Sequence, residues 1–211
     1  MQQERIEPLV EAIYDASLDP AGWARAMALV RESFETGAAC LYSLDYQRRR
    51  MRPVEVGNIA PRFLGSFEAS FYTDDNPSAR TPTLHRPGIV RTDQRLGDYF
   101  RDAEILQRSR YYHEWLQPQD FAHTMGVTPL AEDGIVFNLS LLRSAAAGPY
   151  RADEVRRFER LQSHLRRALR TAQRLDLLTA KGGATSAALD RLGQGVIFVS
   201  GRSRVLHCNA A

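Results

Sequence analysis

The chain has 211 residues, a length that suits one generous domain or one domain and a fragment of another. Apolar residues make up 44% of it, which excludes a disordered chain, and the absence of any run of about 18 apolar residues excludes a membrane span. The formal net charge is +3, and all but Lys181 of the 28 basic residues are arginine. The 25 carboxylates are interspersed among them. This pattern favours an ordinary soluble surface rich in arginine over a surface that contacts DNA.

Two helices are predicted at the start of the chain. In residues 5–17 the apolar side chains recur at helical spacing. Asp19 suits an N-cap and Pro20 suits the first position of a second helix, which we expect to end near Gly37.

Strands and a further helix follow. Residues 38–44 predict a short buried strand, and residues 51–59 predict a second strand. Pro53 restricts this second strand to the edge of a sheet or to a bulge. Residues 61–72 begin with a proline and place phenylalanines on one helical face, whereas 73–88 hold too much Pro, Asn and Asp for regular structure.

The clearest predicted feature is a β-hairpin. Short helical turns are expected over 93–108, and a short helix over Tyr111–Leu116. Residues 121–131 and 134–143 then flank an Asp133-Gly134 step, a strong hairpin signal. The second strand of this hairpin leaves little polar face, so we expect helices to cover both sides of the sheet.

Residues from Ala152 to Lys181 predict one long helix whose apolar side chains follow a seven-residue repeat. About thirty residues span roughly 45 Å, more than packing on one small domain needs. The N-terminal half of this helix can cover the sheet, and we expect the rest to pair with a second copy of the chain. Gly182-Gly183 is expected to break the helix.

The last segment predicts two short strands around the turn "SGRS" (200–203). Two strands do not form a stable domain by themselves. We therefore expect the start of a second domain that has been cut off.

No local motif supports catalysis or metal binding. His113-Glu114 begins a zinc-binding motif, but position 117 is glutamine where a second histidine is needed. The sequence holds no nucleophile elbow, phosphate-binding glycine loop or Cys-x-x-Cys motif. We predict no catalytic residue, no metal and no cofactor. A small enzyme with a dispersed site around Asp74, His113 and Glu114 stays as an alternative.

Aromatic residues indicate a pocket for a small molecule instead. Ligand cavities are largely apolar and aromatic, with a few polar groups that fix orientation. Each single ring fits an ordinary core position better, but the excess of tyrosine and tryptophan favours a pocket wall, since such buried rings need a polar partner. The predicted ligand-binding residues are Phe63, Phe67, Phe71, Asn76, Tyr111, Tyr112, Trp115 and Asn138.

The N-terminus and the cysteines indicate a reducing compartment. The first ten residues lack the basic and apolar regions of a secretory signal. Cys40 and Cys208 lie far apart and form no spaced pair. We therefore expect a cytoplasmic location.

Four segments of the sequence are similar to a known family. They are "LVEAIYDASLDPAGWARAM" (9–27), "YYHEWLQPQDFAHTMG" (111–126), "FNLSLLRSAAAGPYRADEVRRFERLQSHLRRAL" (137–169) and "ALDRLGQGVIFVSGRSRVLHCNAA" (188–211). Together they resemble the N-terminal sensory region of LuxR-type helix-turn-helix transcriptional regulators. The resemblance implies an α/β (α+β) fold with a GAF- or PAS-like antiparallel sheet covered by helices, followed by a long connector helix.

The resemblance also implies three parts of the chain. Residues 1–150 would be the GAF/PAS-like sensor domain, and residues 151–193 the long dimerisation helix and connector. Residues 194–211 would be the truncated start of a PAS-like domain. The DNA-binding domain of such regulators is expected to be absent from this chain.

The better-known branch of this family binds acyl-homoserine lactones through a tryptophan, a tyrosine and an Asp-Pro pair. The aligned positions here are Phe63, Phe67 and Asn76-Pro77. Phenylalanine has no N–H or O–H to donate, and each lost buried hydrogen bond costs on the order of 1 kcal/mol. Asn76 can still accept a bond from an amide N–H, without charge assistance. We therefore expect a different, more apolar or aromatic ligand, or none.

These observations predict a ligand-sensing and dimerisation region of a bacterial transcription regulator. An unidentified small molecule would bind between the sheet and the aromatic helices and shift the packing at the base of the 152–180 helix of a homodimer. DNA would be contacted only through a domain outside this chain. The alternatives are a constitutive dimerisation module without a ligand, the dispersed enzyme, and true lactone binding.

Overall fold

The computed structural model describes residues 6–45, 48, 50–71, 75–132, 134–191, 194–201 and 204–209. They form two compact units, Met1–Arg170 and Thr171–Ala211, which are taken separately below. Helix α5 (Ala152–Leu189) begins in the first unit and ends in the second. Within the described ranges, no helix is both long enough and apolar enough to cross a bilayer.

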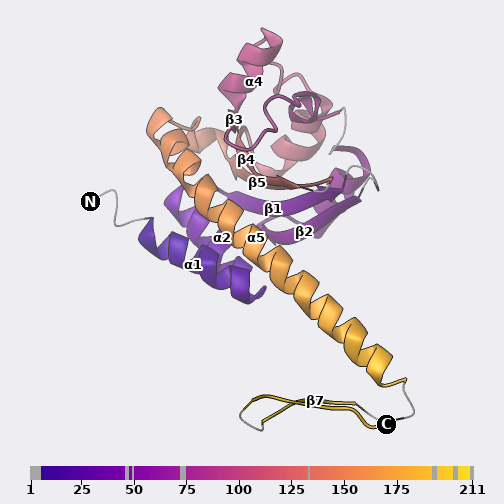
Figure 1. Cartoon of the computed structure of the whole chain (residues 1–211). Coiled ribbons are helices and arrows are strands. Elements are labelled where there is room, and N and C mark those ends of the chain that lie inside the picture. The colour runs from indigo at the N-terminus through magenta and orange to yellow at the C-terminus, as the bar shows by residue number, and fades with distance from the viewer. Residues whose placement is uncertain are drawn as a thin grey trace. The chain divides into compact units, whose positions relative to one another are not determined.

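A five-stranded antiparallel sheet forms the middle of the first unit, with the strand order β2-β1-β5-β4-β3 (Figure 1). In chain order the strands are β1 (Ala38–Asp45), β2 (Arg50–Gly57), β3 (Val90–Thr92), β4 (His123–Glu132) and β5 (Ile135–Arg143). Four of them were predicted. β3 was not, because three residues are too few to show an alternating pattern.

The β4–β5 hairpin is confirmed, with Glu132 opposite Ile135 and His123 opposite Arg143. Asp133 of the predicted turn lies outside the described residues. The edge position of β2 is also confirmed, since it pairs with β1 alone. The β1–β2 register shifts between Leu41 and Tyr42, where Pro53 lies opposite Tyr42. A bulge at an edge accommodates a residue that cannot donate a ladder hydrogen bond.

Three helices cover one face of the sheet: α1 (Glu7–Leu18), α2 (Gly22–Ser33) and the start of α5 (Figure 1). Their apolar side chains form a buried cluster with those of β1 and β5, for example Ile13 and Phe158 with Leu139. The predicted start of α2 was wrong by two residues. Asp19 accepts a bond from the Ala21 N–H at 3.0 Å in a turn that precedes the helix, and Gly22 begins the helix.

Short helical segments cover the opposite face, so the prediction of a sheet covered on both sides is confirmed. In chain order these segments are α3 (Pro61–Ser66), η1 (Phe67–Phe71), η2 (Pro77–Arg80), α4 (Asp93–Phe100), η3 (Tyr112–Leu116) and η4 (Gln117–Gln119), and η5 (Ala145–Ala147) follows β5. The helix predicted over 61–72 continues from α3 into η1, a π-helical turn, and η3 is another. Such turns are rare and often occur at functional sites.

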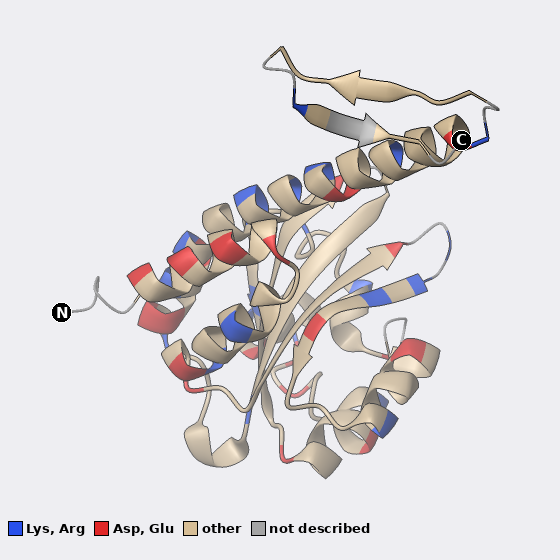
Figure 2. Ribbon diagram, turned by 90° about the horizontal axis from the view of Figure 1, so that it is seen from below, with Lys and Arg blue, Asp and Glu red and all other residues tan. Residues whose placement is uncertain are grey.

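α5 is one continuous helix, so the predicted break at Gly182-Gly183 was wrong. Glycine weakens a helix by about 1 kcal/mol relative to alanine but does not forbid one. Neither glycine has a positive φ angle, and good helix formers flank them. This helix carries more basic than acidic residues, and its acidic residues lie mostly near its start (Figure 2).

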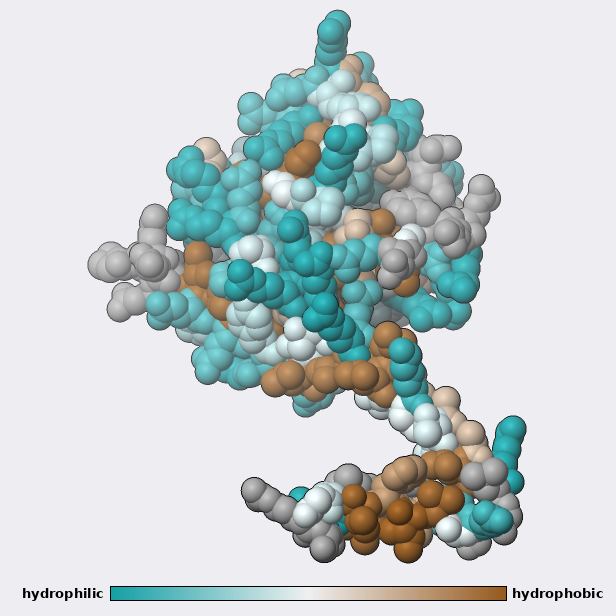
Figure 3. Space-filling model, in the orientation of Figure 1, coloured by the Kyte–Doolittle hydropathy of each residue, from teal (hydrophilic) through white to brown (hydrophobic). Residues whose placement is uncertain are grey.

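The second unit holds the predicted hairpin, β6 (Ile197–Val199) and β7 (Val205–Cys208). Asn209 holds it to the end of α5: its Oδ1 accepts from the Val196 N–H at 2.6 Å, and its Nδ2 donates to the Leu189 carbonyl at 2.8 Å. The apolar side chains of β6 are exposed (Figure 3). The three-part division of the chain remains a prediction.

Candidate functional site

Three of the predicted ring residues, Phe67, Tyr111 and Trp115, pack together, and we call them the aromatic wall. Tyr111 and Trp115 are stacked, with ring centroids 5.2 Å apart and an angle of 18° between the planes. Their spacing of four residues places them on one face of a helical turn. Phe67 of η1 lies 5.2 Å from Trp115 and 6.2 Å from Tyr111, centroid to centroid. Rings from two distant segments of the chain therefore form one surface.

A hydrogen bond fixes these two segments to each other. The indole Nε1 of Trp115 donates to the backbone carbonyl of Phe63 at 2.7 Å. The Phe63 ring meets Trp115 edge-on, but it borders a surface cleft instead of the space inside the wall. Trp115 therefore has the polar partner that a buried indole needs.

A cavity of about 90 Å³ lies between the aromatic wall and the sheet. Cys40 of β1 and Met51 of β2 form part of its apolar lining. Burial raises the pKa of the Cys40 thiol to about 12, so this cysteine is not a reactive thiolate. Pockets for drug-sized ligands enclose about 300–1,000 Å³. This cavity suits a compact molecule.

The other end of the cavity is polar, with Asn76, His85 and Arg91 in its lining. Asn76 is buried, and its Oδ1 accepts from the Ser78 N–H at 2.9 Å, which caps η2. The side-chain oxygen of Asn76 is therefore engaged in holding its own loop.

Arg91 of β3 is buried in a network of polar side chains. Its Nη1 donates to Thr128 Oγ1 at 2.9 Å and its Nη2 to Asn138 Oδ1 at 3.2 Å. Thr128 donates to the same Asn138 oxygen at 2.8 Å. Gly126 leaves room for the guanidinium, since a Cβ there would lie 3.0 Å from Nη2. Asn138, a predicted site residue, thus orients Arg91 but does not itself border the cavity.

His85 lies beside this network. Its Nε2 is 2.9 Å from the Ser78 carbonyl, which can only accept, so Nε2 carries the proton and Nδ1 is the bare nitrogen. Burial and the charge of Arg91 lower the pKa of His85 from 6.5 to about 4, so it is neutral at pH 7. Sequence reasoning missed both His85 and Arg91. The only signal in the sequence was that Arg91 lies in an apolar segment before α4. Strand β3 has three residues, too few for an alternating pattern to show which face of the sheet the Arg91 side chain occupies.

The remaining predicted residues lie outside the cavity lining. Phe71 is buried against Tyr111, with ring centroids 5.7 Å apart. Tyr112 is half-buried and packs edge-on against His113. The aromatic stripe predicted from the sequence is therefore divided between the cavity and the adjoining core.

Two residues of the alternative enzyme site, His113 and Glu114, lie on the exposed surface. Glu114 forms an ion pair with Arg110 at 2.8 Å. Asp74 lies outside the described residues. In the part of the chain that the structure describes, no three His, Cys, Asp or Glu side chains form a group that could hold a metal ion.

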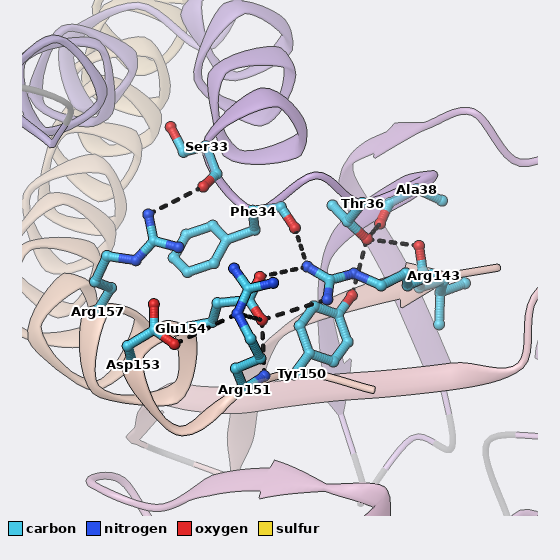
Figure 4. Close-up of polar contacts among 11 residues, drawn as sticks. Ser33, Phe34, Thr36, Ala38, Arg143, Tyr150, Arg151, Asp153, Glu154 and Arg157 are labelled. Carbon is cyan, nitrogen blue, oxygen red and sulfur yellow. Dashed lines mark hydrogen bonds and ion pairs between the residues drawn. The ribbon is translucent and has the colours of Figure 1, made fainter. Parts of the chain in front are cut away.

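A buried ion pair joins the sheet to α5 (Figure 4). Arg143, at the end of β5, places Nη2 2.6 Å from Oε1 of Glu154, in the first turn of α5. Arg143 also donates to the carbonyl of Phe34, just after α2. Burial works against the charge of Glu154, but hydrogen bonds from Arg143 and the Arg151 N–H outweigh it and lower the pKa of this carboxyl. Glu154 is therefore ionised at neutral pH.

The ion pair is continuous with a residue of the cavity wall. The Tyr150 ring covers the Arg143 guanidinium at 4.0 Å (Figure 4), and its hydroxyl lies 2.9 Å from Thr36 Oγ1. Thr36 in turn donates to the carbonyl of Leu142 at 2.5 Å. Leu142 lines the cavity, and Arg143 is the next residue. The cavity and the first turn of α5 are therefore linked through the end of β5.

Several solved structures share this fold. The VqsR ligand-binding domain of Pseudomonas aeruginosa superposes with a TM-score of 0.61 at 12% identity, covering 82% of this chain and 96% of that one. CepR2 of Burkholderia cenocepacia, an N-acylhomoserine-lactone-dependent LuxR family transcription factor, gives 0.58 at 15% identity, covering 83% and 98%. A GAF domain from an Acinetobacter phosphoenolpyruvate-protein phosphotransferase gives 0.53 at 11% identity, covering 83% and 97%.

No protein-family model and no curated protein sequence matches the chain. At these identities the structural likeness concerns the fold. The predicted α+β architecture, a GAF-like antiparallel sheet with covering helices and a long C-terminal helix, is confirmed.

Proposed function

We propose that this chain is the ligand-sensing and dimerisation region of a cytoplasmic LuxR-type transcription regulator. The observation that carries the proposal is a cavity bounded by the aromatic wall on one side and by buried polar side chains on the other. Apolar rings with a few fixed polar groups are typical of small-molecule sites. The fold shared with VqsR and CepR2 supports the same function.

A signal would pass from the cavity to α5 through the Arg143–Glu154 ion pair. Leu142 borders the cavity, and Arg143 holds Glu154 in the first turn of the helix. A molecule that displaced the end of β5 would therefore displace the base of α5. Tightly packed, low-dielectric contacts of this kind transmit displacement better than exposed ones.

The output would be a homodimer formed through α5. Leu175 and Leu178 lie on the face that continues the apolar repeat and are 37% and 64% exposed. In the regulator that this region serves, a change at the base of the two helices would alter the placement of a pair of helix-turn-helix domains.

Lactone binding of the kind named for CepR2 has little support here. Phe63 lies outside the cavity lining, Phe67 has no donor, and the oxygen of Asn76 already accepts from Ser78. Of the three lactone-binding positions implied by the family resemblance, Phe63 and Phe67 thus offer no hydrogen-bond donor, and the Asn76 oxygen keeps only the lone pair that Ser78 leaves free. The cavity volume favours a more compact molecule.

Thermal shift measurements with single-ring compounds and acyl-homoserine lactones test the sensing half of the proposal. We expect at least one compound to raise the melting temperature of the wild type and to act more weakly on Trp115→Phe. Trp23→Phe is the matched control, because Trp23 is equally buried but lies in the core on the opposite face of the sheet. If no compound stabilises the wild type, the chain is a constitutive dimerisation module.

Hydrogen exchange of the amides in residues 152–160 tests the relay. A stabilising compound should alter their exchange in the wild type and do so less in Arg143→Lys, which keeps the charge but loses the planar fork that binds a carboxylate. An equal response in both proteins would disprove the role of the ion pair.

A further inference from the structure

The hydroxyl of Tyr111, a residue of the cavity lining, makes no hydrogen bond to another residue that the structure describes. Tyr111 is 6% exposed, and its side chain lines the cavity. Burial and the nearby Tyr42 and Cys40, which also line the cavity, raise the pKa of this hydroxyl well above its ordinary value. It therefore keeps its proton. Buried tyrosine hydroxyls normally find an acceptor, and an unmade bond of this kind is costly.

A second unsatisfied position lies at the polar end of the same cavity. The bare Nδ1 of His85 and the Nδ2 of Asn138 are both buried without a hydrogen bond to a described residue. The two side chains lie close enough for Asn138 to influence the pKa of His85, but not in hydrogen-bond geometry. Of the two residues, only His85 lines the cavity, and a ligand hydroxyl beside it can donate to the unprotonated imidazole nitrogen.

The size and lining of the cavity restrict what can carry these polar groups. An apolar cavity of about 150 Å³ in another protein takes up benzene, whereas this one encloses about 90 Å³. A compound with a single ring is therefore the largest ligand that fits after small movements of the side chains that line the cavity. Met51, an adaptable side chain in the lining, can supply such a movement. The stacked rings of the aromatic wall favour a planar guest.

We propose that the cavity takes a single-ring hydroxylated aromatic compound whose oxygen accepts a hydrogen bond from the Tyr111 hydroxyl. This inference rests on the proposed function, which it makes more specific. It names Tyr111 as the residue that distinguishes a hydroxylated ring from a plain one, while the rest of the aromatic wall binds both.

Isothermal titration calorimetry with 4-methylphenol and toluene tests the assignment, since the two probes differ by one hydroxyl. We expect 4-methylphenol to bind the wild type more tightly than toluene does. Tyr111→Phe should weaken the binding of 4-methylphenol by roughly five- to tenfold, the effect of one hydrogen bond, and leave toluene unchanged. Tyr99→Phe, at an exposed tyrosine of α4, should behave as the wild type.

The melting temperature of the free proteins gives a second, independent measurement. Tyr111→Phe removes an unsatisfied polar group, so it should not lower the melting temperature. A clear decrease would mean that the hydroxyl has a structural partner and would overturn the assignment. Equal binding of 4-methylphenol to wild type and Tyr111→Phe, or tighter binding of N-dodecanoyl homoserine lactone, would overturn it while leaving the sensing function intact. If none of the probes and no other compound binds, both proposals fail.

Discussion

Arg143 and Glu154 form an ion pair in which the two side chains are 3% and 1% exposed, at the junction of the sheet with α5. Removing one partner from such a pair leaves the other charge buried without compensation, at a cost of about 3–5 kcal/mol. We therefore expect Glu154→Gln to lower the free energy of unfolding by about this amount in urea titrations. Glu159→Gln is the control: its half-exposed pair with Arg95 should contribute about 0–1 kcal/mol. Equal effects of the two substitutions would show that the buried pair contributes no more to the free energy of unfolding than the half-exposed pair does.

The neutral state of His85 makes the stability of the first unit depend on pH. Its pKa is about 4 in the folded protein and 6.5 ordinarily, so between these values the unfolded chain binds a proton that the folded chain does not. The free energy of unfolding should therefore decrease as the pH falls from 6.5 to 4, by up to about 3 kcal/mol. Urea titrations of the wild type and His85→Asn across this range measure it. The variant should lose this part of the slope, whereas His113→Asn, at an exposed histidine, should retain it.

The two glycines within α5 should weaken the helix locally. Nothing lies within 4 Å of a Cβ added at Gly182 or Gly183. Alanine at either position should stabilise the helix by about 1 kcal/mol and slow hydrogen exchange in residues 176–189. Gly22→Ala should have the opposite sign, because its Cβ would lie 2.9 Å from the backbone Cα of Ala16. Unchanged exchange after both alanine substitutions in α5 would contradict a helix that runs through them.

The proposed dimer makes a prediction about the exposed leucines of α5. Leu175→Asp together with Leu178→Asp should shift the protein from dimer to monomer in sedimentation experiments, since a charge in an apolar helix seam opposes pairing. Leu177→Asp provides the comparison, because Leu177 is also exposed but lies on a different face of the helix. A loss of dimer in both the double variant and Leu177→Asp, or in neither, would argue against a seam through Leu175 and Leu178.

Some residues of the cavity lining were predictable from the sequence, and others were not. The spacing of Tyr111 and Trp115 is local, so their shared face was predictable, and they do stack. Their contact with Phe67 joins segments more than forty residues apart, and periodicity carries no information about such a distance. The polar end was missed because His85 lies in an irregular loop and Arg91 in a three-residue strand.

The sequence by itself determined the local elements: the β4–β5 hairpin, the edge strand with Pro53, and the long amphipathic helix. Each depends on side-chain patterns and backbone preferences within a few residues. Only the tertiary structure decided that α5 continues through Gly182-Gly183, that Asn138 supports Arg91, and that Arg143 pairs with Glu154. These outcomes depend on burial and on partners that the fold brings together. The free energy of a buried charge or hydrogen bond is set by the groups around it. Those groups come from distant parts of the chain, so local sequence patterns do not reveal them.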